Sequence, residues 1–161
     1  MIDQALYNFI SDRKIVLVNT DITFLPFNDN IVVRFNNQFP VLQTKETTDI
    51  LVLNEPLSKE EIQDNYAPRF ILWCPPKYDI LTKYLREVSY YLPQETYLQL
   101  CKAVKGVPSI ELLTLTYLYT YTQQIDLTYF KLTSSNINEN LFLKFITKTP
   151  DINYSIPENI Q

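Results

Sequence analysis

The chain has 161 residues, of which 46% are hydrophobic, enough for one domain with a substantial core and too few residues for two ordinary domains. Its net charge is −4 and it carries no run of basic residues, which argues against a nucleic-acid-binding surface. It has no histidine and a single glycine, Gly106. These two absences exclude Ser-His and Cys-His nucleophiles and the standard glycine-rich phosphate loops.

The remaining composition favours a soluble, cytoplasmic protein. The longest apolar run, residues 110–121, contains Glu111 and several threonines and is too short for a membrane span. The first residues contain Asp3 and lack the basic segment of a secretory signal. Cys74 and Cys101 are the only thiols, and we interpret both as small buried side chains, with no zinc site or disulfide framework.

In the first half of the chain, strands are predicted at short β-branched runs. Asp3 is a candidate cap for a helix over residues 4–11. Residues 14–18 form an apolar run of strand length, typical of a buried parallel strand, and further strands are predicted over residues 31–35, 49–53 and 69–74. Ser58 and Glu61 form a capping-box signature that predicts a short helix over residues 59–65.

In the second half the apolar period changes to that of helices. Spacings of three and four residues predict helices over 78–91 and from Pro93 to Gly106, the glycine taking the left-handed position after the helix end. Pro108 opens a third helix, to about Tyr121, that is apolar all round and therefore buried. Residues 124–132 alternate and predict a strand, and residues 138–147 predict a last helix.

These elements predict an α/β fold: a single Rossmann-like domain over residues 1–150, with a mainly parallel central sheet flanked by helices. Residues 151–161 are predicted to form a flexible C-terminal tail. The strand over residues 14–18 runs directly into the polar turn Asn19-Thr20-Asp21. Because open α/β sheets bind ligands outside the carboxyl ends of their strands, this turn is the expected ligand site.

Five segments carry a resemblance to a known family. They are KIVLVNTDIT from residue 14, NIVVRFNN from residue 30, TTDILVLNEP from residue 47, VPSIELLTLTYLYTY from residue 107 and IDLTYFKL from residue 125. In this order the chain resembles the bacterial sialyltransferase-like glycosyltransferases. The best-matched motifs are Arg34-Phe35-Asn36, Thr48-Asp49-Ile50 and Pro108-Ser109.

The resemblance implies a nucleotide-sugar donor, a glycan acceptor and a role in surface glycan synthesis, with no cofactor and no metal ion. It places donor binding at Thr20, Asp21, Arg34, Asn36 and Ser109. The glycines of the family's first turn are replaced here, Asp21 and Glu111 put carboxylates where a phosphate would lie, and the catalytic histidine is missing. Impaired or altered activity is therefore expected, and no catalytic residue is assigned.

Two other functions fit the same residues. The chain could be a non-catalytic binding or assembly protein that keeps the fold and binds a protein partner or a second copy of itself. Alternatively, Asp21 and Glu111 could act as paired carboxylates in a hydrolase, if the fold brings them within about 10 Å of each other. In structural interpretations of the site residues, Arg34 and Asn36 would form a loop salt bridge and a cap, and Ser109 would cap a helix.

Overall fold

The computed structural model describes residues 4–20, 30–36, 48–74, 77–122, 124–131, 136–147 and 152–153. The strands in these ranges are β1 (Ile15–Val18), β2 (Ile31–Phe35), β3 (Ile50–Leu53), β4 (Phe70–Trp73), β5 (Ser89–Tyr91), β6 (Ile125–Asp126) and β7 (Ile152–Asn153). They form one sheet in the order β5-β4-β3-β2-β1-β6-β7, and each described pair of neighbours is parallel. The predicted α/β class with a mainly parallel sheet is confirmed.

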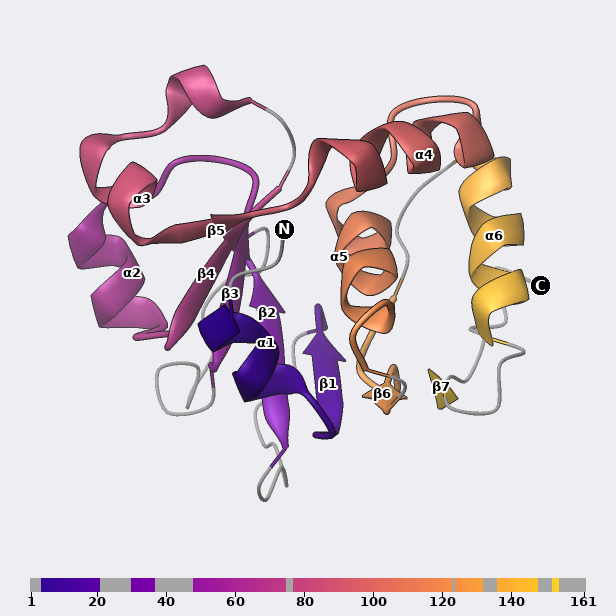
Figure 1. The fold of residues 1–161 in the computed structure, drawn as a ribbon, viewed down its shortest axis with the longest axis horizontal. Helices are drawn as coiled ribbons and strands as arrows, with labels where there is room; N and C mark the ends of the chain where they lie inside the picture. The colour runs from indigo at the N-terminus through magenta and orange to yellow at the C-terminus, as the bar shows by residue number, and fades with distance from the viewer. Residues whose placement is uncertain are drawn as a thin grey trace.

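Helices lie on both sides of the sheet (Figure 1). They are α1 (Gln4–Ile10), α2 (Lys59–Asn65), the 3₁₀ turn η1 (Tyr78–Ile80), α3 (Lys83–Val88), α4 (Gln94–Val104), α5 (Ile110–Tyr119) and α6 (Ile137–Thr147). No helix in the described part of the chain is long and apolar enough to cross a membrane.

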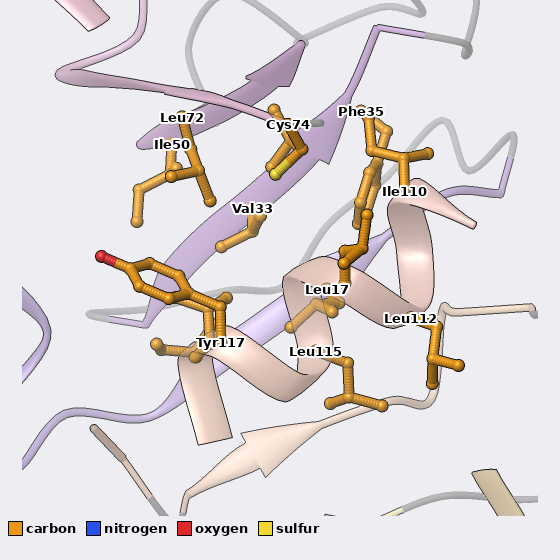
Figure 2. Close-up of a cluster of buried hydrophobic side chains, with 14 of the residues drawn as sticks. Leu17, Val33, Phe35, Ile50, Leu72, Cys74, Ile110, Leu112, Leu115 and Tyr117 are labelled. Atoms are coloured by element: carbon orange, nitrogen blue, oxygen red, sulfur yellow. The ribbon is translucent and has the colours of Figure 1, made fainter. Parts of the chain in front are cut away.

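The larger core lies between the sheet and α5. Leu17, Val33 and Cys74 point from β1, β2 and the end of β4 toward this helix, as Figure 2 shows. Ile110 and Tyr117 of α5 belong to the same buried cluster. Since successive strand residues point to opposite faces, only every second residue of each strand enters this core. The predicted helix that is apolar all round is confirmed, because eight of the ten residues of α5 are buried.

A second core covers the other face of β3 and β4. Leu53 and Trp73 contact Ile62 of α2 and Leu85 of α3 in one buried cluster. The predicted capping box is confirmed: the Glu61 amide donates to the Ser58 hydroxyl and the Ser58 amide donates to the Glu61 carboxylate. With both faces buried, the strands read as continuous apolar runs in the sequence.

The predicted single helix over residues 78–91 is wrong. The segment divides into η1, the short helix α3 and the edge strand β5. Thr82 caps α3, because its hydroxyl accepts a hydrogen bond from the Leu85 amide. Ser89, Tyr90 and Tyr91 then pair with Ile71, Leu72 and Trp73 of β4. Pairing with a neighbouring strand decides this conformation, and three residues are too few to show a strand period.

The end of α4 also differs from the prediction. The residue in the left-handed conformation is Lys105, with φ of 55°, and Gly106 is not among the residues with positive φ. The amides of Lys105 and Gly106 both donate to the Cys101 carbonyl. A glycine near a helix end marks where the helix stops, and here the left-handed turn falls one residue earlier.

Beyond β1 the sheet differs from the prediction in two ways: β6 is shorter than expected, and a further strand, β7, pairs with it. The strand expected over residues 124–132 is limited to Ile125–Asp126, because the Asp126 carboxylate accepts from the Thr128 amide, at 2.9 Å, and closes a turn. Ile152–Asn153, inside the segment predicted as a flexible tail, pairs with β6 as β7. Two-residue strands carry no periodic signal in a sequence.

Candidate functional site

The strand order places the expected ligand site between β1 and β6. From β1 the chain adds strands on one side as far as β5 and then returns to place β6 and β7 on the other side. In open parallel sheets, such a reversal of strand order leaves a crevice at the carboxyl ends of the two strands. Asn19 and Thr20 follow β1 directly and lie at this position.

The polar groups of Asn19 and Thr20 bind the segment that follows β6. The Asn19 side chain accepts from the Lys131 amide at 2.7 Å and donates to the Lys131 carbonyl. The Asn19 amide and the Thr20 hydroxyl both donate to the Tyr129 carbonyl, at 3.2 and 3.1 Å. Asn19 is buried. These groups therefore join β1 to the chain beyond β6, and Asp21, the next residue, lies outside the described ranges.

Asn36 makes a similar connection one strand further along the sheet. Its side-chain oxygen accepts from the Asn54 amide at 3.2 Å, and its own amide donates to the Val52 carbonyl at 3.0 Å. It therefore holds the end of β2 against the end of β3. Like that of Asn19, its side-chain oxygen accepts a hydrogen bond from a backbone amide of another segment.

Arg34 is a buried residue inside the sheet. It pairs in register with Val18 and Leu51, and it is 5% exposed. Burial lowers the pKa of the Arg34 guanidinium, and interaction with the Tyr66 phenol opposes this shift. Burial likewise raises the pKa of Tyr66, and Arg34 opposes that shift. Because Tyr66 follows α2, Arg34 points to the face opposite α5.

Ser109 caps α5 and is held by a carboxylate that the sequence did not single out. The Ser109 hydroxyl accepts from the Leu112 amide at 3.2 Å, the bond of an N-terminal cap. Its hydroxyl and amide donate to Oε1 of Glu139, at 2.6 and 2.9 Å, and Glu139 is 1% exposed. An acidic residue in the first turn of a predicted helix is common, so nothing in the sequence marked Glu139 as a partner.

Four of the five residues assigned to donor binding lie in the described part of the chain. Arg34 lies on one face of the sheet, and Ser109 on the other, at the start of α5. Thr20 and Asn36 bind neighbouring loops. Glu111 is buried in the first turn of α5, and its pairing with Asp21 stays a prediction because Asp21 lies outside the described residues. Among the described residues, no three acidic or cysteine side chains cluster as metal ligands would.

A hollow opens instead at the carboxyl ends of β4 and β5. It has a volume of about 670 Å³ and is lined by Tyr78, Asp79, Leu81, Arg86 and Tyr91. The two tyrosine rings meet edge to face, with centroids 5.4 Å apart, and both are partly exposed. The spacing of apolar residues predicts one amphipathic helix over these residues, and a single helix would form no such hollow. The signal available was the cluster of aromatic residues after Pro75-Pro76.

Hydrogen bonds to the backbone fix the walls of the hollow. The Tyr78 hydroxyl donates to the Leu92 carbonyl at 3.4 Å, and the Tyr91 hydroxyl donates to the Arg86 carbonyl at 3.0 Å. Arg86 Nε donates to the Leu81 carbonyl at 3.2 Å. Side chains held in this way do not need to be ordered when a ligand binds, which lowers the entropic cost of binding.

Cys74 is a buried thiol at the end of β4. Burial raises its pKa to about 12, and a hydrogen bond with Thr114 opposes this rise. Burial also raises the pKa of Tyr78, and the neighbouring Cys74 and Tyr91 raise it further. A thiol that stays protonated in the folded chain is a poor nucleophile, so Cys74 is structural in this fold.

The raised pKa of Cys74 predicts a loss of stability in alkali. The folded state keeps the thiol proton, whereas the unfolded thiol loses it above its ordinary pKa of 9.0, so stability falls as the pH rises from 9 toward about 12. The free energy of unfolding should drop by about 1 kcal/mol between pH 9 and 10, measured by urea denaturation. Cys74→Ala should flatten this slope and the control Cys101→Ala should keep it; an unchanged slope in Cys74→Ala would contradict the assignment.

Comparisons of the chain with protein-family models, with curated proteins and with solved structures find no match in any of the three. The resemblance to the sialyltransferase-like glycosyltransferases stays a prediction from the sequence motifs.

Proposed function

We propose that this chain is a non-catalytic binding protein on a glycosyltransferase-like frame, and that it binds a small molecule in the hollow beside β4 and β5. One observation carries the proposal. The side chains of Asn19, Thr20, Asn36 and Ser109, at or beside the positions expected to face a donor, instead hydrogen-bond to other parts of the chain. A buried polar group that already has its partners gains little by turning to a ligand.

The hollow supports the second half of the proposal. It lies beside the carboxyl end of β5, where Tyr91 is the last residue of the strand. Its walls are mainly aromatic and apolar, with one basic and one acidic side chain, and this mixture is usual for small-molecule sites.

The other candidate is a nucleotide-sugar-dependent transferase resembling the sialyltransferase-like enzymes. The reversal of strand order at β1 and β6 favours it, because nucleotides bind at such points in related architectures. Isothermal titration with cytidine and uridine nucleotides separates the two candidates. The binding protein should give no heat with either nucleotide at millimolar concentration. Nucleotide binding that Arg34→Ala weakens would favour the transferase and overturn the proposal.

The hollow itself is tested by a panel of small aromatic and polar compounds, with binding followed by protein NMR. Tyr91→Ala should abolish the shifts that any bound compound causes. Tyr7→Ala is a matched control, because Tyr7 is similarly exposed and meets Tyr121 edge to face, with ring centroids 6.1 Å apart. A panel in which no compound binds, or in which Tyr91→Ala binds as well as the parent chain, would contradict a ligand site in the hollow.

A further inference from the structure

The tyrosines of the hollow offer ring surface to a ligand. Both hydroxyls donate to backbone carbonyls, Tyr78 to Leu92 and Tyr91 to Arg86. With the hydroxyl protons used in this way, what faces the hollow is chiefly the aromatic carbon surface, together with the apolar side chain of Leu81. Such a surface binds an aromatic or large apolar group, and aromatic pairs gain stability beyond the area they bury.

Arg86 offers the two terminal amino groups of its guanidinium. Its Nε donates to the Leu81 carbonyl at 3.2 Å, which holds the guanidinium plane in one orientation. The described ion pairs are Lys14 with Asp126 and Arg69 with Asp49, and Arg86 belongs to neither. A guanidinium held at Nε presents its terminal amino groups side by side, the arrangement that binds a carboxylate through two parallel hydrogen bonds.

Asp79 supplies the opposite charge in the same hollow. It is exposed and takes part in no described ion pair, including one with Arg86. The described lining residues of the hollow thus combine one cation, one anion and an aromatic wall, and their charges sum to zero. A ligand with a single charge could pair with Arg86 or with Asp79, but it would leave the other side chain without an oppositely charged group.

We propose that the ligand is a zwitterionic α-amino acid with an aromatic or large apolar side chain. Its carboxylate binds the terminal amino groups of Arg86, its ammonium binds the carboxylate of Asp79, and its side chain lies against Tyr78, Tyr91 and Leu81. This assignment rests on the proposed function, since it names the ligand class for the same hollow. It adds that each of the two charges of the ligand strengthens its binding.

The test uses four related probes on the full chain, with binding followed by NMR titration. L-Phenylalanine carries both charges and the ring, 3-phenylpropionate lacks the ammonium, 2-phenylethylamine lacks the carboxylate, and L-alanine lacks the ring. L-Phenylalanine should bind best. Each charge-deleted probe should bind up to about fivefold more weakly, the effect of an exposed ion pair, and L-alanine should show no binding.

Variants assign each charge to its partner. Arg86→Gln should bind L-phenylalanine only as tightly as the parent chain binds 2-phenylethylamine, and its affinity for 2-phenylethylamine should be unchanged. Asp79→Asn should bind L-phenylalanine only as tightly as the parent chain binds 3-phenylpropionate, and its affinity for 3-phenylpropionate should be unchanged. Lys83→Gln and Glu87→Gln are matched controls, because both are exposed residues of α3 that do not line the hollow. Both controls should bind L-phenylalanine as the parent chain does.

The outcomes separate the ligand class from the proposed function. If 3-phenylpropionate binds as tightly as L-phenylalanine, or if Arg86→Gln leaves L-phenylalanine binding unchanged, the amino-acid assignment is overturned. Benzyl alcohol is included as a neutral aromatic probe. A further outcome is that benzyl alcohol binds the parent chain but not Tyr91→Ala, while L-phenylalanine binds neither. In that case the hollow is a ligand site and only the amino-acid assignment fails. If no probe binds, both proposals fail.

Discussion

Replacing Glu139→Ala is expected to lower the free energy of unfolding by about 3 kcal/mol. The carboxylate accepts from both the hydroxyl and the amide of Ser109, and it is 1% exposed. Removing it leaves two donors without their acceptor where the start of α5 meets α6, and hydrogen bonds to a charged acceptor are stronger than neutral ones. Urea denaturation followed by circular dichroism measures the change.

Two further variants make the Glu139 result interpretable. Glu139→Gln keeps an acceptor oxygen near Ser109 and should cost only about 1 kcal/mol. Glu87→Ala, on the exposed side of α3, should change stability by less than about 0.5 kcal/mol. If Glu139→Ala is as stable as Glu87→Ala, the carboxylate does not hold the two helices together.

Replacing Asn19→Ala is expected to lower the free energy of unfolding by about 2.5 kcal/mol. Its amide group satisfies both the amide and the carbonyl of Lys131 from a position that is 5% exposed. Without it, the described bonds between the end of β1 and the segment after β6 are reduced to the two that the Tyr129 carbonyl accepts. Urea denaturation at neutral pH measures this loss.

Asn19→Asp distinguishes the contribution of the hydrogen bonds to stability from that of side-chain packing. An aspartate can still accept from the Lys131 amide, but it places a second oxygen against the Lys131 carbonyl, where asparagine donates. It should therefore be at least as destabilising as alanine despite its similar size. Asn8→Ala is the control, because Asn8 is exposed and accepts only a local bond from Gln4. Equal stability of Asn19→Asp and the parent chain would refute the connection.

The central strands could be predicted from the sequence because buried strands consist almost entirely of apolar residues. Strands such as β1 and β3 are covered on both faces and are therefore uninterrupted apolar runs. The capping box of α2 is a local signal and was equally readable. The short strands depend on pairing with a neighbouring strand, as that of β6 with β1 through Ile125 and Ile15 shows, and no local pattern records such a partner.

The site was harder to predict for a related reason. Asn19 and Ser109 have the residue types of a ligand site, and only the fold reveals that Lys131 and Glu139 already bind them. The hollow was missed because Tyr78 and Tyr91 were assigned to a single helix, which would have separated them along its axis. The break at Thr82 and the start of β5 bring the two rings together.

The strand order also has a consequence for native-state opening. β1 and β2 are joined over four residue pairs, whereas β1 and β6, and β6 and β7, are joined over two each. The shortest ladders of the described sheet lie at this side, so we expect β6 and β7 to open as a unit before the rest. Amide protons of β6 should exchange with solvent through this sub-global opening, and those of β2 and β3 only through global unfolding. The Asn19 side chain, bound across the boundary to Lys131, then sets how often the unit opens.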